Sequence, residues 1–570
     1  MSFARGLLLS GVLTGWLLTA CAPNDATAPA PTPPADDGAN VRVTRVQFTQ
    51  GAQDEAGSIP MVAGRPMVAN VLIQRSREST ASVPIVLRLY RGGVLLRVDT
   101  TQSGGVLGPS VNPASPSAQF LVPGVVVRDS LWWQVEIDPA NTTPDSTRTD
   151  NLFPANAPGV VTSVELPSLD VHFVPITLTQ HSGLTGNVST LNLDDYIAGV
   201  RSMLPTGTVT ATLGAPMTSE SSFGTPPEGG GPTFWLSVLQ DVDVARTLSD
   251  SPQSVWYGVV PIPAGFSKLT NGGYAFVPSN PTRVGSGTRT AVSLELSPVY
   301  GARYGRDVVT HELGHIFGRS HAPGCGALAP IDTAFPGPLG SIGTPGHDVF
   351  SWSSGVTISA LSYPASTGDV MSYCTRVWTS PYTWSAVLRW RQASAVVVTR
   401  TERSRATLIA GSIAADGHVT LRPALDADVR MQPSVSDGDV TVEQRDAGGA
   451  VIGRQQVVSA AVDHGGGIRQ FLAVMPGAGA AAQIVATTRS GASARITAHA
   501  SSDIISARIT STGASELSSA TGSALLVRDD HTGDVLGIGW NGRITINRSS
   551  GYSVTVSDGV RSRRATVIQR

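Results

Sequence analysis

The segment that most constrains this chain is HELGHIFGRSH, His311 to His321, because it holds three histidines and a glutamate at fixed spacings. The surrounding pattern is typical of a helix, and residues four apart on a helix leave the same face. His311 and His315 can therefore occupy two corners of one metal tetrahedron. Gly318 favours a left-handed turn that ends the helix and returns His321 as a third ligand. The sequence predicts a helix followed by a tight turn, folded around a metal.

This ligand set predicts Zn²⁺ as the cofactor. Three protein ligands leave one tetrahedral position open, as catalytic zinc sites do. Glu312, next to the first histidine, is placed to accept a proton from water and to deliver it to a leaving amine. The predicted reaction is hydrolysis of a peptide bond. Two alternatives stay open: a closed structural zinc site, which needs a fourth Cys or His ligand and gives Glu312 no role, and a zinc unit that has lost activity.

A second motif, DVMSYC from Asp369 to Cys374, follows the histidines in the chain. HExxHxxGxxH followed by such a methionine turn resembles the signature of the metzincin clan of zinc proteases. The resemblance implies an α/β zincin fold for residues 168–395, with Met371 as an apolar floor beneath the histidines. It also implies that Tyr373, as in astacins and serralysins, reaches the zinc or steadies the transition state. Ala322, after the third histidine, matches none of the well-known families, so the family stays open.

Other stretches are similar to those of exported bacterial proteases. HAPGCG, which begins at the third histidine, the YC ending of the methionine turn and VWTSPYTW after it together look like a group of secreted bacterial zinc proteases. VAGRPMVANVLI is similar to a stretch in the N-terminal domain of bacterial proteases that attack mucin-type glycoproteins. The resemblance implies an extracellular protein or glycoprotein as substrate.

GGYAFVP predicts a strand upstream of the helix. In metzincins the corresponding strand is the sheet edge that binds peptide, so the resemblance implies that an extended substrate pairs with Gly273, Tyr274, Ala275 and Phe276. An interior strand fits these residues equally well. The histidines outside the motif, His464 among them, show no ligand spacing and are expected to be solvated or packed.

The N-terminus, residues 1–21, resembles a bacterial lipoprotein signal peptide with a lipobox. Arg5 gives a positive start, Leu7 to Leu18 form an apolar stretch too short to span a bilayer, and LTAC ends at Cys21. The resemblance implies cleavage before Cys21 and lipidation of its side chain and new N-terminus. The protein is then anchored in the bacterial cell envelope, at the outer membrane or cell surface and outside the cytoplasm. An ordinary secretory signal is the alternative.

The chain has 3 cysteines. With Cys21 lipidated, Cys325 and Cys374 remain in an exported chain, and we predict that they form a disulfide. The bridge would join the loop of the third ligand to the methionine turn; two buried free thiols are the alternative. A cysteine that blocks the zinc, as in matrixins, is not expected because the only upstream cysteine is Cys21. Another pro-region device stays open.

The chain has 570 residues, too many for one hydrophobic core. Its fold class is predicted as multidomain, with the α/β zincin (metzincin) catalytic domain flanked by β-sandwich domains. A Pro/Ala/Asp-rich flexible linker is expected at 22–40. Alternating β-branched segments predict a β-sandwich at 41–167, whose end resembles bacterial immunoglobulin-like modules, a second sandwich at 396–500 and a small β domain at 501–570.

Charge excludes one class of partner. The 40 basic and 42 acidic residues leave a net charge of -2, which gives no field to attract nucleic acid. The expected partners are the protein or glycoprotein substrate and, through the N-terminal lipid, a membrane. Two other functions fit the same motifs: a surface adhesion or scaffold lipoprotein with an inactive zinc domain, and an amidase acting on cell-wall peptides.

Overall fold

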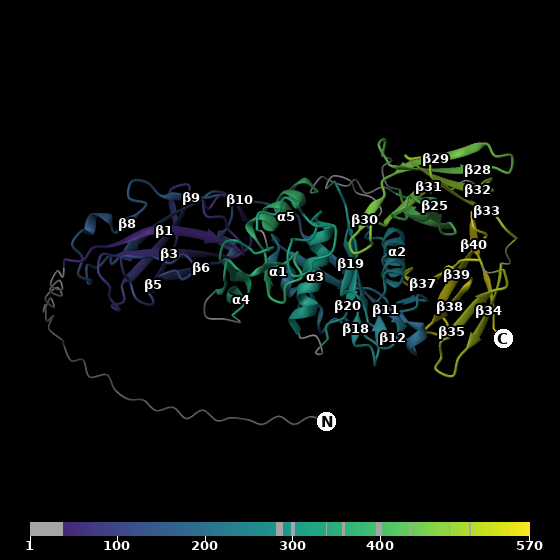
Figure 1. Cartoon of the computed structure of the whole chain (residues 1–570), viewed down its shortest axis with the longest axis horizontal. Helices are drawn as coiled ribbons and strands as arrows, with labels where there is room; N and C mark the ends of the chain where they lie inside the picture. Colours follow the sequence, from purple (N-terminus) through teal and green to yellow (C-terminus); the bar gives the residue numbers. More distant parts are fainter. Residues whose placement is uncertain are drawn as a thin grey trace, which may run out of the picture.

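The structure, a computed structural model, describes residues 38–280, 289–297, 302–337, 339–355, 360–394, 402–431, 435–477, 479–500, 503–521 and 523–569. The predicted signal peptide, with Cys21, lies outside the described residues. Figure 1 shows an elongated, β-rich, multidomain chain with one group of strands at one end, a unit with helices in the middle and further strands at the other end. In the described part, no helix is long and apolar enough to cross a membrane.

Two antiparallel sheets pack face to face in the N-terminal part and share one apolar core. One has the order β1-β3-β6, and the other has the order β5-β4-β7-β8 with β9 also beside β7. In β7, buried residues alternate with more exposed ones, because successive side chains of a strand point to opposite faces. The strands are β1 Val41–Thr49, β2 Met61–Val62, β3 Met67–Arg75, β4 Pro84–Arg91, β5 Val94–Gln102, β6 Ala118–Val122, β7 Leu131–Ile137, β8 Leu152–Phe153, β9 Gly159–Val161 and β10 Ser163–Val164.

The middle unit is a mixed sheet covered by helices. Strands β13, β11, β17 and β20 run parallel in that order, and β19 pairs antiparallel with β20. Its elements are β11 Leu169–Leu178, β12 Leu184–Thr185, α1 Leu193–Met203, β13 Val209–Leu213, β14 Met217–Ser219, β15 Gly224–Thr225, β16 Glu228–Gly229, α2 Pro232–Leu248, β17 Val255–Val260, β18 Lys268–Leu269, β19 Gly273–Val277, β20 Thr290–Leu294, α3 Ala302–Ile316, β21 Gly346–Asp348, α4 Val349–Ser353, β22 Leu361–Tyr363, β23 Gly368–Asp369, β24 Val377–Trp378 and α5 Pro381–Ala393.

The two faces of this sheet bury different helices. Phe173 of β11 belongs to a core cluster with α1 and α3, whereas its neighbour Val174 belongs to a cluster with α2. Consecutive residues of a strand face opposite sides, so β11 separates the two layers. The metal motif therefore lies on the face shared by α1 and α3.

Strands from the C-terminal part extend the same sheet at both ends. β30 pairs with β19, and β37 pairs with β14. The remaining strands are β25 Arg403–Ile413, β26 Val419–Leu421, β27 Leu425–Arg430, β28 Val440–Arg445, β29 Val451–Val457, β30 Ala460–Val462, β31 Arg469–Pro476, β32 Gln483–Thr488, β33 Ser493–Thr497, β34 Ile504–Ile509, β35 Ser515–Ser519, β36 Leu525–Asp529, β37 Val535–Gly539, β38 Arg543–Ile546, β39 Tyr552–Ser557, β40 Ser562–Arg564 and β41 Thr566–Gln569.

A buried arginine joins the N-terminal sheets to the middle unit. Arg65 is 4% exposed and donates to the backbone oxygens of Ser202, Leu204 and Thr206 at the C-terminal end of α1. A cation is favourable there because the last carbonyl groups of a helix have no partner within it.

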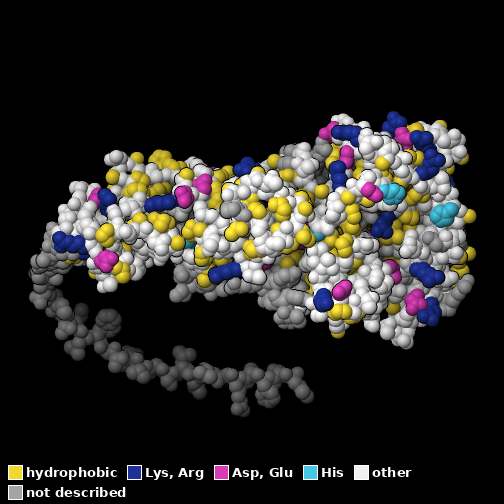
Figure 2. All heavy atoms as spheres, in the orientation of Figure 1, with side chains coloured by type: hydrophobic (Ala, Val, Ile, Leu, Met, Phe, Trp, Pro, Cys, Tyr) yellow, Lys and Arg dark blue, Asp and Glu magenta, His cyan; other side chains and the backbone are white. Residues whose placement is uncertain are grey.

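The surface of the protein carries no large patch of charge of one sign on the face shown in Figure 2.

Candidate metal centre

Helix α3 and the turn after it carry the three motif histidines. The helix presents His311 and His315 from the same side, and Gly318 ends the turn with φ +74. This left-handed conformation favours glycine, and a Cβ at Gly318 would also lie 2.4 Å from the Trp390 ring. The reversal brings His321 back toward the helix, as the spacing predicts.

The three imidazoles converge on one point. Nε2 of His315 lies 3.1 Å from Nε2 of His311 and 3.1 Å from Nε2 of His321. Atoms bound about 2.0–2.1 Å from a tetrahedral Zn²⁺ are roughly 3.3 Å apart, so the separations suit a metal. A metal can therefore be held by His311, His315 and His321.

Backbone oxygens set the tautomer of each ring. The Nδ1 atoms lie 2.8, 2.7 and 2.7 Å from the carbonyl oxygens of Val370, Arg319 and Leu328 in turn. A proton on Nδ1 satisfies these carbonyls and leaves the Nε2 lone pairs free for a metal. Burial also favours the neutral rings: it lowers the pKa of His311 to about 3 and of His321 to about 4, and that of His315 well below its ordinary value.

Glu312 lies beside these rings and is 1% exposed. Its carboxyl group lies beside that of Asp463, and burial, followed by the charge of Asp463 and a hydrogen bond with its side chain, raises the pKa of Glu312 well above the ordinary value. A Cβ at Gly273 would lie 2.6 Å from Oε1 of Glu312. A carboxyl group so placed needs a glycine opposite it, and its raised pKa suits a group that exchanges a proton with a ligand.

The methionine turn, residues 369–374, packs against the helix and the loop that carry the three histidines. Met371 is 1% exposed, and a Cβ at Gly314 of α3 would lie 2.3 Å from its Sδ atom. Its backbone oxygen accepts from the N–H of Ala322, next to the third histidine. Cys325 and Cys374 form a disulfide with Cα atoms 5.2 Å apart, so the predicted pairing is confirmed. The bridge ties the loop of the third ligand to the methionine turn.

The strand predicted to bind substrate has no free edge next to its partner β30. Phe276 and Val277 of β19 pair with Val462 and Ala461. The side chains of Tyr274 and Phe276 belong to the core cluster on the α2 face. β19 is thus the interior strand that the sequence left as an alternative, because a segment from the C-terminal part occupies the edge.

Two residues of the site escaped the sequence analysis. Asp463 and His464 follow β30, and both belong to ligand groups formed with the motif residues. Tyr373 lies beside the His321 ring, and its hydroxyl contacts Nε2 of His464. His464, expected to be solvated or merely packed, instead faces the metal site; the sequence around it, VDHGGG, has no ligand spacing that could have shown this.

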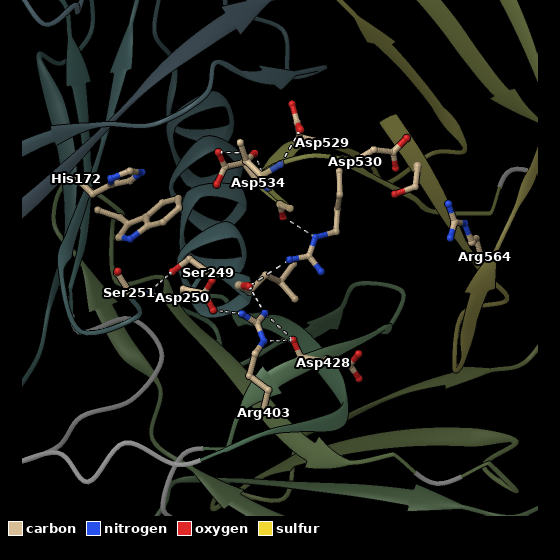
Figure 3. A pocket seen from close by; sticks show the side chains of 16 residues that line it. His172, Ser249, Asp250, Ser251, Arg403, Asp428, Asp529, Asp530, Asp534 and Arg564 are labelled. Carbon is tan, nitrogen blue, oxygen red and sulfur yellow. Dashed lines mark hydrogen bonds and ion pairs between the residues drawn. The ribbon is translucent and has the colours of Figure 1, made fainter. Parts of the chain in front are cut away.

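A second concave region lies at the junction of the middle unit and both C-terminal groups of strands, with a volume of about 750 Å³. Figure 3 shows Arg403 bonded to Asp250 and to the backbone of Asp428. Arg528 donates to the oxygens of Gly533 and Leu248. These bonds connect the middle unit to the C-terminal strands.

Comparison with known proteins adds no family to this geometry. No protein-family model matches the chain, and no curated protein matches it. Among solved structures, a CARDB domain from Pyrococcus furiosus is 14% identical, covers 22% of this chain and 95% of its own, and has a TM-score of 0.14. A β-glucuronidase from Parabacteroides merdae is 9% identical, covers 92% of this chain and 76% of its own, also with a TM-score of 0.14. Scores this low carry no argument about fold or activity.

Proposed function

We propose that this protein is a zinc-dependent endopeptidase of the metzincin type, with residues 168–395 as its α/β zincin catalytic domain. One observation carries the proposal: three imidazoles converge around one point beside the buried carboxyl group of Glu312. The helix, the turn at Gly318 and Met371 beneath the rings agree with the resemblance. The ligand type, with three histidines and no thiolate, suits Zn²⁺ in a hydrolytic site.

The metal, Glu312 and Tyr373 would each contribute to a different step of the hydrolysis. Bound Zn²⁺ supplies a Lewis acid that polarises a carbonyl and makes water more acidic. Glu312 would take the proton of the attacking water at Oε2 and return it to the leaving amine nitrogen. Tyr373, which lies beside the His321 ring, would donate a hydrogen bond to the developing oxyanion. The expected substrate is an extended segment of an extracellular protein or glycoprotein.

The test uses the chain without residues 1–21 and a panel of unfolded protein, mucin-type glycoprotein and peptidoglycan. Cleavage of protein that a chelator stops and Zn²⁺ restores is expected, and Glu312→Ala should lose it while still binding zinc. Cleavage of peptidoglycan alone would favour the cell-wall amidase. Tight zinc binding without cleavage of any substrate, even after the change at Asp463 described below, would favour the adhesion or scaffold protein.

We also propose that Cys21 carries the lipid that anchors the protein in the bacterial cell envelope. Cys325 and Cys374 are bonded to each other, which leaves Cys21 as the remaining cysteine of the 3 in the chain. Cells fed a radioactive fatty acid should label the full chain and not Cys21→Ser. A Cys21→Ser protein that stays in the membrane fraction would contradict the anchor.

A further inference from the structure

The segment that covers β19 comes from the turn between β30 and β31. Figure 1 shows β30 reaching from the strands around β25 and β31 to the side of β19, close to α3. β30 pairs antiparallel with β19, and Asp463, directly after it, donates its N–H to the oxygen of Ala275 at 3.1 Å. The N–H of Ala275 bonds in turn to Oδ1 of Asp463. The segment therefore uses the backbone groups that an extended substrate would need.

The other carboxylate oxygen of Asp463 points at the metal ligands. Oδ2 lies 3.4 Å from Nε2 of His315, close to the roughly 3.3 Å between two ligands of a tetrahedral zinc. The Asp463 side chain is 0% exposed, and its Oδ2 also lies 2.9 Å from Nδ1 of His464. The carboxyl group of Glu312 lies beside it as well. A buried carboxylate oxygen at ligand spacing from His315 is positioned to bind a metal that the histidines hold.

His464 contacts three other parts of the site. Its Nε2 contacts the Tyr373 hydroxyl, its Nδ1 lies 3.2 Å from the oxygen of Gly273, and its ring stacks on that of His321 at 4.9 Å. The residue has φ +56, a left-handed conformation that costs energy for any side chain. The chain accepts this strain in order to hold one residue against the tyrosine, the substrate strand and a metal ligand together.

We infer that Asp463 is the fourth ligand of the metal and that residues 460–464 lie along β19 where an extended substrate would bind. In this structure the site is therefore closed by a segment of its own chain. The statement that a substrate would bind along β19 rests on the proposed function, whereas the assignment of the fourth ligand rests on geometry alone. It names the latency device that the sequence left open: a carboxylate from a segment after the catalytic unit, in place of an upstream cysteine.

The segment 460–464 is attached in a way that allows it to move away from β19. Its strand pairs with β31 through Ala460 and Ala461, and the N–H of Val462 adds one bond to the oxygen of Ile468. The turn after His464 contains Gly465, Gly466 and Gly467, two of them at positive φ. Short pairings and a glycine turn open at less cost than a domain unfolds. Displacement of this hairpin would free the fourth position of the metal, the Tyr373 hydroxyl and the edge of β19 at once.

The test measures how well the zinc-loaded chain without residues 1–21 binds acetohydroxamate, which needs the fourth position. Affinity is followed by the visible spectrum after Co²⁺ replaces zinc. Because an internal ligand competes at millimolar effective concentration, Asp463→Ala should bind acetohydroxamate roughly tenfold or more tightly than the parent. Asp463→Asn keeps the size of the side chain and should give an intermediate gain. Asp446→Asn, in another turn of the same group of strands, is the matched control and should behave as the parent does.

Equal acetohydroxamate affinity in the parent and both Asp463 variants would overturn the inference. Loss of the metal from folded Asp463→Asn would overturn it as well, because the three histidines must be able to hold the metal without a ligand that only closes the site. A rise in affinity accompanied by a tenfold or greater gain in protein cleavage supports the closed form and the peptidase together. A rise in affinity without cleavage by any variant keeps Asp463 as the closing ligand and refutes the proposed function, so the two failures are distinguishable.

Discussion

The disulfide between Cys325 and Cys374 should hold both the fold and the metal. The two residues are 49 positions apart, and for a closed loop of that length the chain-entropy relation gives about 4 kcal/mol at about 25 °C. The bridge also fixes the backbone oxygens behind two ligands, since Leu328 and Val370 accept from His321 and His311. Loss of such support behind a metal ligand weakens binding by about 10–100-fold.

The double variant Cys325→Ser with Cys374→Ser tests both effects. Urea titrations with a chromophoric zinc chelator present follow the unfolding of the site itself, which matters because a chain of several domains does not unfold in one step. We expect the free energy of unfolding to fall by about 4 kcal/mol and the zinc dissociation constant to rise by about 10–100-fold.

A matched variant separates the effect of losing the disulfide bond from the effect of backbone strain at Cys325. Cys325 has φ +52, where glycine is at ease and serine is not, so Cys325→Gly with Cys374→Ser should be more stable than the double serine by about 1 kcal/mol. A double serine variant within about 1 kcal/mol of the parent, with unchanged zinc affinity, would refute the view that the bridge supports the site.

Three further substitutions test the packing beneath the site and between the N-terminal sheets and the middle unit. A Cβ at Gly314 would lie 2.3 Å from Sδ of Met371, so Gly314→Ala should cost about 1–3 kcal/mol in a thermal melt; Met371→Ala should recover part of the loss, and additive losses would contradict the contact. Burial lowers the pKa of His347 from 6.5 to about 4, so the unfolded chain binds more protons between these values, and stability should fall by about 3 kcal/mol as the pH drops through this window; denaturant titrations of His347→Gln should lack that fall. Arg65→Met leaves the carbonyls at the end of α1 without their donor and should cost about 1–3 kcal/mol, with limited proteolysis releasing the N-terminal sheets; a cleavage pattern like the parent's would contradict this.

The sequence predicted the parts of the site whose geometry is local. His311, Glu312 and His315 lie on consecutive turns of one helix, so their spacing alone determines which face they share. Gly318 ends that helix within the same short segment. The disulfide followed from counting cysteines, which needs no knowledge of the path between them.

The sequence could not predict contacts that depend on pairing between distant strands. β20, whose five residues TAVSL are all buried, shows no alternation and was missed for that reason. The edge position assigned to Gly273 and its neighbours depended on what lies beside β19, and that neighbour, β30, comes from the C-terminal part of the chain. Asp463 and His464 reach the metal site through this pairing, so no spacing near the motif could reveal them.

This distant contact also bears on whether the metal is structural or catalytic. A structural zinc needs four protein ligands, and Asp463 offers the fourth, which by itself would favour a closed structural site. Glu312 favours the other reading, because its carboxyl group is buried, burial of a carboxyl group costs free energy, and a structural zinc site gives this group no role. A buried proton acceptor beside the ligands, together with a strained, glycine-flanked fourth ligand, therefore fits the proposed catalytic site held closed by its own chain.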